Sequence, residues 1–329
     1  MAQRFSQSDL PLNTIGFLLV PGFALMSYAS AVEPLRAANL FAGQELFKWH
    51  HITMGEETGD ENIVTASCGA TIPCPITVGD DINLDLLLVC AGGDPSSFED
   101  PPTFAWLRRL ANSGIRMGGI SGGPFILAKA GIMAGRHMTI HWEHAPALAE
   151  AYPDLMLTRS LYIADRNRLT CAGGVAPLDM MHALITEHCG VEFATSVSDW
   201  FLHTEIRPAG GPQRASLVER YGIHRRDLIT ALELMENNLS EPLSRSDIAQ
   251  QIHLSTRQLD RLFTKYIGAG FAAHYKSIRL QRARDLLRST PLPVTDIAMA
   301  CGFSSLSHFS RSFREAFGFP PRSTRKRNN

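Results

Sequence analysis

The sequence predicts two domains of different class: an α/β domain with a parallel sheet and helices on both of its faces, then an all-α domain with two helix-turn-helix units. Strand and helix patterns alternate up to about residue 203, whereas only helical patterns follow. Residues 1–213 carry 12 Lys+Arg against 22 Asp+Glu, a net charge of −10, and residues 214–329 carry 19 against 10, a net charge of +9. A basic domain on an acidic one favours a polyanionic partner for the second domain.

Apolar runs and helical periodicity alternate through the first domain. Short apolar runs predict strands over residues 14–20, 84–90 and 115–120, and a hairpin over 161–174 with its turn near Asp165-Arg166-Asn167. Helical patterns predict helices over residues 27–43, 103–114, 123–131 and 176–190, each ending at a glycine before the next element. Such alternation is typical of a parallel sheet covered on both faces.

A stretch rich in proline, glycine and polar residues separates the two domains. The segment "EIRPAGGPQRAS" (205–216) has no apolar period and is typical of a linker. We therefore predict a first domain over residues 12–204, a linker over 205–222 and a second domain over 223–329.

The second domain contains an internal repeat. Residues 224–239 predict a helix, and further helices are expected to begin at Ser244, Ser255, Phe271, Val294 and Ser304, the first two with serine caps. "DIAQQIHLSTRQLDRLFTKYIG" (247–268) aligns with "DIAMACGFSSLSHFSRSFREAFG" (296–318), with Ser255 matched to Ser304 and one residue inserted after that pair. Each copy has the pattern of a helix-turn-helix, and the helix between them would hold the two reading helices at a fixed separation.

Polar side chains are expected to face outward from the second helix of each copy. They are Ser255, Thr256, Arg257, Gln258, Arg261 and Lys265 in the first copy, and Ser305, Ser307, His308, Arg311 and Arg314 in the second. Arginine and glutamine can bind guanine and adenine edges, whereas serine and lysine more often bind phosphate. A helical bundle with ordinary basic surfaces is the alternative, but two copies in register with a net charge of +9 favour double-stranded DNA as the partner.

Residues 224–325 resemble the AraC/XylS type of DNA-binding domain. The resemblance rests on "DIA", "LSTRQLDRLF", "RLQRARDLLRST" and "VTDIAMACGFSSLSHFSRSFREAFGFPPRSTR". One departure is Thr324, where the family usually has tyrosine, and we expect a minor packing change there.

The segment "GISGG" (119–123) fits the G-x-S-x-G pattern of a serine nucleophile elbow. Three interpretations of Ser121 are open: a hydroxyl that binds a ligand, a structural turn residue, or a nucleophile. A serine nucleophile needs a positioned general base. His141 is a candidate base, with Glu143 or Asp179 as the acid that would orient it, but His141 could equally be a core histidine.

Residues 14–203 resemble the DJ-1/PfpI type of class I glutamine-amidotransferase-like domain, which has a flavodoxin-like fold. The carriers are "TIGFLLVPGF", "AVEPLRAAN", "LLLVCAGGD", "GGISGGPFILAKAGIMAGRHMTIHW" and "TCAGGVAPLDMMHAL". The resemblance implies that Ser121 stands where enzymatic members carry a cysteine, that Glu33 hydrogen-bonds the elbow side chain, and that His141 is the downstream histidine. The catalytic cysteine is absent, so we expect no enzyme; Glu33 could instead be a buried acid capped by backbone amides.

The combination of the two domains resembles the GlxA-like regulators, which include sensors of glycine betaine, carnitine and arginine. A ligand site is expected at the carboxyl ends of the strands, where the free amides of the helix after the elbow favour a carboxylate. The candidate ligand-binding residues are Tyr28, Glu33, Gly92, Gly93, Ser121, Phe125, His141 and Trp142. Aromatic faces would suit a quaternary amine, although Trp142 could also be a core residue.

These observations predict a cytoplasmic regulator that activates catabolic genes in response to a small amino-acid-like or quaternary-amine effector. A homodimer and contact with RNA polymerase are expected. We expect no membrane segment, because no apolar run reaches the roughly 18 residues that a span needs, and no metal or cofactor, because the six cysteines lack metal-binding spacing. A serine hydrolase or amidase with an appended DNA-binding module, and a repressor or architectural protein without an effector, are the alternatives.

Overall fold

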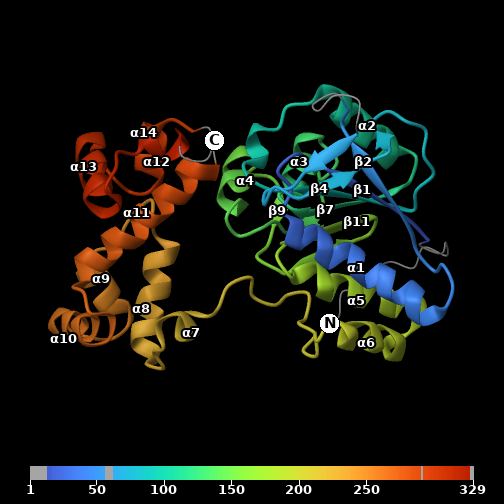
Figure 1. The fold of residues 1–329 in the computed structure, drawn as a ribbon. Coiled ribbons are helices and arrows are strands. Elements are labelled where there is room, and N and C mark those ends of the chain that lie inside the picture. Colours follow the sequence, from blue (N-terminus) through green and yellow to red (C-terminus); the bar gives the residue numbers. More distant parts are fainter. Residues whose placement is uncertain (1–12, 56–61, 290–291, 327–329) are drawn as a thin grey trace. The chain divides into compact units, whose positions relative to one another are not determined.

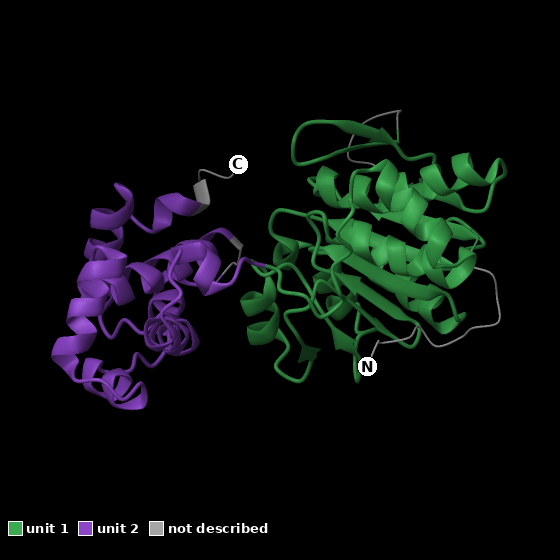
Figure 2. Cartoon of the chain, turned by 90° about the horizontal axis from the view of Figure 1, so that it is seen from below, with its two compact units in different colours: residues 1–213 green, residues 214–329 purple. Residues whose placement is uncertain are grey.

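The computed structural model describes residues 13–55, 62–289 and 292–326. The ends of the predicted domains, residues 12 and 327–329, lie outside these ranges. The chain divides into two compact units, residues 1–213 and 214–329 (Figure 2). The first is an α/β unit and the second is helical, so the predicted fold class is confirmed. None of the helices in the described ranges is long and apolar enough to cross a membrane.

A seven-stranded sheet forms the centre of the first unit. Its strands stand in the order β10 (Tyr162–Asp165), β11 (Arg168–Cys171), β7 (Arg116–Ser121), β6 (Leu86–Ala91), β1 (Thr14–Leu19), β2 (Lys48–Thr53) and β5 (Ile76–Thr77). All neighbours pair in parallel except β10 and β11, which form the predicted hairpin with Arg166 at φ 56° in its turn. The predicted strands are confirmed, whereas β2 was not predicted. Its sequence "KWHHIT" has no apolar run, because it is less buried than its neighbour β1.

Helices cover both faces of this sheet (Figure 1). Helices α1 (Leu25–Ala42), α5 (Ala176–Cys189) and α6 (Val191–Trp200) share one apolar cluster, and α2 (Pro101–Asn112), α3 (Gly123–Lys129) and α4 (Ala145–Ala151) share the other. Side chains of β1 alternate between them, with Phe17 in the first cluster and Leu18 in the second, as the two-residue period of a strand requires. Gly43 ends α1 as predicted, in the left-handed conformation at φ 63°. Short pairs β3–β4 (Ile63–Thr65 and Thr71–Pro73) and β8–β9 (His137–Met138 and Met156–Leu157) lie outside the main sheet.

The second unit is a series of helices around two apolar clusters. They are α7 (Leu217–Tyr221), α8 (Arg226–Asn237), α9 (Arg245–Gln251), α10 (Thr256–Leu262), α11 (Phe271–Ser289), α12 (Val294–Ala300), α13 (Leu306–Phe317) and α14 (Arg322–Lys326). A π-helical turn, Phe263–Ile267, extends α10. The amino-terminal half of α11 packs in the cluster of α9 and α10 through Phe271 and Tyr275, and its second half packs in the cluster of α12 and α13 through Leu280 and Leu287. One helix therefore supports both helix-turn-helix units.

The two helix-turn-helix units differ at the turn and at the cap of the second helix. His253 occupies the left-handed conformation in the first turn, at φ 57°, and Gly302 does so in the second, at φ 72°. Ser244 and Ser255 cap α9 and α10, as predicted. The predicted start at Ser304 is wrong by one residue, because the Ser305 Oγ accepts the cap hydrogen bond from the amide of His308. The inserted residue of the repeat thus precedes the cap, and Ser255 corresponds to Ser305.

The segment expected to be a linker begins with residues that pack on the first unit. Asp179, in the first turn of α5, is fully buried, and its carboxylate accepts hydrogen bonds from His203 Nε2 (2.9 Å) and from the Arg207 amide (2.8 Å) and guanidinium (2.6 and 3.0 Å). Farther along, the Gln213 amide donates to the carbonyl oxygens of Ile140 and Ser160. The two compact units then divide between Gln213 and Arg214.

The ion pair between Asp179 and Arg207 should contribute strongly to the stability of the first unit. In Arg207→Ala the fully buried carboxylate loses its guanidinium partner, and we expect the free energy of unfolding to fall by about 3–5 kcal/mol. All four tryptophans lie in residues 1–213, so urea unfolding of the full chain followed by tryptophan fluorescence reports this unit. Arg36→Ala is the control, because Arg36 forms an exposed pair with Glu33 and should cost less than about 1 kcal/mol. Equal effects of the two substitutions would contradict the role of Asp179.

Candidate functional site

Ser121 lies on a tight turn between β7 and α3. It is the last residue of β7. Its backbone has φ 62°, a left-handed conformation that residues other than glycine rarely adopt. A Cβ at Gly123 would lie 1.9 Å from the Val89 carbonyl oxygen, and one at Gly119 would lie 2.5 Å from the Pro124 nitrogen. The glycines on either side of Ser121 are therefore required by close backbone contact, and the chain forms the elbow that G-x-S-x-G predicts.

Two other segments meet the elbow at the carboxyl edge of the sheet. Ser27 lies in the first turn of α1, and its hydroxyl accepts a hydrogen bond from the Gly174 amide at 2.8 Å. A Cβ at Gly173 would lie 2.7 Å from the Ser121 Cβ and 2.9 Å from the Ser27 Oγ. Ser27 was not among the predicted site residues. Its place in the helix that follows the carboxyl end of β1 is the signal that could have identified it.

The predicted hydrogen bond from Glu33 to the elbow side chain is wrong. The Glu33 carboxylate instead pairs with the Arg36 guanidinium at 2.7 Å, and both side chains are close to half exposed. Glu33 lies six positions after Ser27, so the two side chains project from different turns of α1. Ser27 is the α1 side chain that adjoins the elbow, and it supplies a hydroxyl rather than a carboxylate.

His141 lies beside the elbow through its backbone. Its amide donates to the Ser121 carbonyl oxygen at 3.3 Å, and its Nδ1 accepts from the Glu143 amide at 3.4 Å. Burial lowers the pKa of His141, so the ring is neutral at pH 7. Asp179 is occupied by His203 and Arg207, and no carboxylate is hydrogen-bonded to His141 within the described ranges. The prediction that Asp179 could orient His141 is therefore wrong.

The aromatic residues expected around the ligand do not form one cage. The ring of Tyr28 packs edge-on against Phe17 and Phe23 in the cluster of α1, and its hydroxyl lies 2.6 Å from His51 Nε2. Phe125 is buried in the cluster on the opposite face of the sheet. Tyr28 and Phe125 are thus core residues separated by the sheet, and their assignment to one ligand site is wrong.

Trp142 and the Gly92-Gly93 turn each follow a residue that touches the elbow, and their part in ligand binding stays a prediction. Trp142 is half-buried, and its ring centroid lies 5.3 Å from that of His141. A Cβ at Gly92 would lie 2.6 Å from the Gly22 carbonyl oxygen, so the loops after β1 and β6 touch at this edge. Gly93 is exposed at φ 59°.

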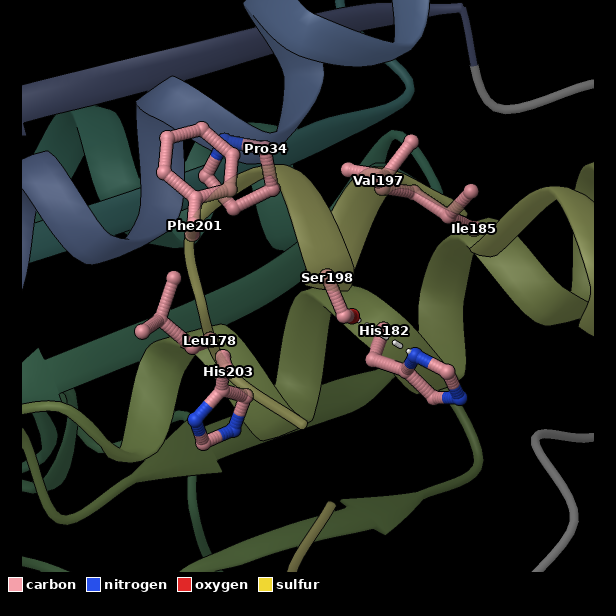
Figure 3. A pocket seen from close by; sticks show the side chains of 8 residues that line it. All are labelled: Pro34, Leu178, His182, Ile185, Val197, Ser198, Phe201 and His203. Carbon is pink, nitrogen blue, oxygen red and sulfur yellow. Dashed lines mark hydrogen bonds between the residues drawn. The ribbon is translucent and has the colours of Figure 1, made fainter. Parts of the chain in front are cut away.

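A small pocket opens among α1, α5 and α6 (Figure 3). It is lined by Pro34, Leu178, His182, Ile185, Val197, Ser198, Phe201 and His203. His182 Nδ1 and the Ser198 hydroxyl lie 2.9 Å apart within it. The lining is mostly apolar and includes none of the residues of the elbow, so this pocket is separate from the candidate ligand site.

Helix α10 presents most of its predicted DNA-contacting side chains to solvent. Arg257, Arg261 and Lys265 are exposed, whereas Thr256 is half-buried. Ser255 and Gln258 form a capping box, in which the Gln258 amide oxygen accepts hydrogen bonds from the Ser255 amide and hydroxyl, each at 2.9 Å. In this arrangement Gln258 holds the end of the helix, and Arg257 is an exposed side chain of the first turn that can donate two hydrogen bonds.

Helix α13 exposes a comparable set. Ser307, His308, Arg311 and Arg314 are exposed, and Ser305 is the helix cap. Leu306, the first residue of the helix, is also 41% exposed and was not predicted as a contact. The buried face of the helix is formed by Phe309, Ser312 and Phe313.

Not every arginine of the basic unit faces outward. The Arg279 guanidinium, from the middle of α11, donates to the carbonyl oxygens of Cys301 (2.7 Å) and Gly302 and lies 4.2 Å above the Phe303 ring centroid. It therefore satisfies acceptors at the carboxyl end of α12 and fixes the second turn to α11. Arg284 lies 4.7 Å above the ring of Phe317 in the same way.

Comparison with known proteins identifies both units. Residues 14–187 match the DJ-1/PfpI family, and residues 248–327 match a helix-turn-helix domain family. The chain is 47% identical to the HTH-type transcriptional regulator GlxA of Rhizobium meliloti over 98% of both chains. It is 40% identical to the regulator CdhR of Pseudomonas aeruginosa over 93% of this chain and 89% of that protein. It is 38% identical to the regulator GbdR of the same organism over 95% of this chain and 84% of that protein.

The chain belongs to the AraC-type transcriptional regulators that carry an amino-terminal DJ-1/PfpI domain. The relatives span nearly its whole length, so the resemblance extends over both units and their connection. A crystal structure of a ThiJ/PfpI family protein from Pseudomonas syringae, 21% identical, has a TM-score of 0.50 and covers 79% of this chain and 97% of that one. It agrees with the fold of the α/β unit.

In this regulator, His144 should make the α/β unit sensitive to acid. His144 is 4% exposed, and burial, with His141 nearby, lowers its pKa from 6.5 to about 3. As the pH falls below 6.5, His144 binds a proton in the unfolded chain but not in the folded chain. The free energy of unfolding therefore decreases. Between pH 8 and pH 5 this loss should be about 2 kcal/mol.

The measurement is urea unfolding by tryptophan fluorescence at pH 8, 7, 6 and 5. His144→Phe keeps a planar ring but removes the titrating group, so its free energy of unfolding should fall less steeply with pH than that of the wild type. Parallel pH profiles for the two proteins would contradict this prediction.

Proposed function

We propose that this regulator activates its target genes when a small amino-acid-like or quaternary-amine metabolite binds the α/β unit beside the elbow. The observation that carries the proposal is the meeting of Ser27, Ser121 and the Gly173-Gly174 turn at the carboxyl edge of the sheet. Binding would favour the arrangement of the chain that is competent for DNA, in proportion to its difference in affinity for the two states. We propose that the protein acts in the cytoplasm together with RNA polymerase.

The chemistry of the site suits recognition better than catalysis. Ser27 and Ser121 offer hydroxyls for a carboxylate, and the face of Trp142 offers a surface for a quaternary ammonium group. Position 121 carries a serine hydroxyl instead of a cysteine thiol. Within the described ranges, no carboxylate is hydrogen-bonded to His141 to orient it. A serine nucleophile depends on such a base, so we propose that the unit binds its effector without chemical turnover.

The names of the relatives are consistent with this reading, since all of them are transcriptional regulators. The resemblance of this two-domain chain to sensors of glycine betaine, carnitine and arginine supplies three candidate effectors. A carboxylate and a cationic nitrogen are common to all three. We therefore propose these two groups as the features that the site recognises.

A thermal-shift measurement on the full chain tests the effector. We expect one of glycine betaine, L-carnitine and L-arginine, at 100 times its Kd, to stabilise the protein by about 2.7 kcal/mol. The carbon isostere 3,3-dimethylbutanoate lacks the cation and should give a much smaller shift than glycine betaine. Ser121→Ala and Trp142→Ala should each reduce the shift of the true effector.

Two outcomes would favour the alternatives. Turnover of an ester or amide that Ser121→Ala abolishes would support the serine hydrolase. A protein that no metabolite stabilises, and whose reporter output no metabolite changes, would support a repressor or architectural protein without an effector.

We also propose that the α/β units pair as a homodimer, since paired DNA half-sites suit a two-fold protein. An exposed apolar surface at the carboxyl ends of α1 and α6 supports this. Phe41 (43% exposed) and Trp200 (54%) contact edge to face at 5.6 Å between centroids, with Leu40 (57%) and Leu202 (88%) beside them. An exposed cluster of this kind is typical of a protein contact.

Trp200→Glu should convert the dimer to a monomer, because it places a charge in the centre of this apolar surface. Sedimentation velocity of the full chain at micromolar concentration measures the change. Val175→Glu, at another exposed apolar residue of the same unit (45%), should leave the dimer intact. A monomeric wild type, or a dimeric Trp200→Glu, would refute this interface.

A further inference from the structure

The two reading helices differ in the chemistry of their first residue. Phe309 and Phe313 of α13 occupy the buried positions that Leu259 and Phe263 occupy in and after α10, and both helices begin after a serine cap. In this register Leu306 corresponds to Thr256. The first residue is therefore polar in one helix and apolar in the other.

Burial accounts for only part of the Leu306 side chain. It is 41% exposed, whereas Phe309 and Phe313 of the same helix are fully buried. The exposed residues next to it are polar: Ser305, Ser307 and His308. The amino-terminal residues of a recognition helix are those that contact base edges in the major groove.

We propose that Leu306 reads the methyl group of a thymine in the segment of DNA that α13 contacts. The thymine C5 methyl is the apolar group that DNA presents in its major groove, and an aliphatic side chain is its natural partner. Arg311, five residues farther along α13 and exposed, can bind a nearby guanine. The inference rests on the DNA-binding role of the second unit and assigns it a base preference.

Met299 provides a matched control in the same helix-turn-helix. It is an exposed apolar residue (71%) near the end of α12. The first helix of such a unit crosses the DNA backbone instead of entering the groove. Met299 therefore shares the apolar character of Leu306 without its place in the reading helix.

The experiment uses the full chain and a duplex selected by it from a random library. Each thymine of the selected site is replaced singly by deoxyuridine, which removes the methyl and nothing else, and the Kd is measured by fluorescence anisotropy. We expect about fourfold weaker binding at one or two positions, the value of one buried apolar carbon. Leu306→Ala should bind the thymine duplex about fourfold more weakly and lose its sensitivity to uracil at those positions, whereas Met299→Ala should keep it.

Arg257→Ala identifies the segment of DNA that α10 contacts, since it should relax base preference there. The uracil-sensitive positions should lie in the segment that α13 contacts. Sensitivity that persists in Leu306→Ala, or that is lost equally in Met299→Ala, would overturn the assignment of Leu306, as would a selected site with no sensitive thymine. Failure of the full chain to select any sequence would overturn the DNA-binding role as well, so the two failures are distinguishable.

Discussion

The hydrogen bonds to the buried carboxylate of Asp179 hold the segment that leaves the α/β unit against helix α5. Asp179 lies in the first turn of α5, and that helix begins directly after the Gly173-Gly174 turn that touches Ser121 and Ser27. The same carboxylate holds His203 and Arg207, in the segment that leaves the α/β unit. A carboxylate in this position is stable because four donated hydrogen bonds replace the water it has lost. The elbow, the start of α5 and the first part of the connection thus form one continuous set of contacts.

Much of the fold could be predicted from the sequence, because burial leaves a direct pattern in it. The runs that become β1, β6 and β7 are apolar since both faces of the sheet are covered, and Gly43 marks the end of α1. The strand β2 escaped prediction because its residues are half-buried and include two histidines. The elbow was predictable too, since its glycines follow from close approach of the backbone.

The arrangement of side chains in the site was less predictable. Glu33 and Ser27 lie on the same helix, and a linear pattern does not say which of them faces Ser121. Tyr28 and Phe125 both follow strand ends, yet the sheet lies between them, because each belongs to a helix on a different face. In the second unit, the repeat located both helix-turn-helices, but it did not place the insertion relative to the cap. It also could not separate arginines that face outward, such as Arg257, from Arg279, which binds the chain's own carbonyl groups.

The close contact at Gly302 has a consequence for the DNA. A Cβ there would lie 2.6 Å from the Leu239 carbonyl oxygen and 2.7 Å from Pro242, so the second turn rests against the connection between α8 and α9. Together with the α11 helix, this contact joins the two reading helices into one body. The double helix turns by about 35° per base pair. Two reading helices held at a fixed separation therefore require a fixed spacing between the DNA segments that they contact. An operator with one base pair added between the segments that α10 and α13 contact would present one of them out of phase.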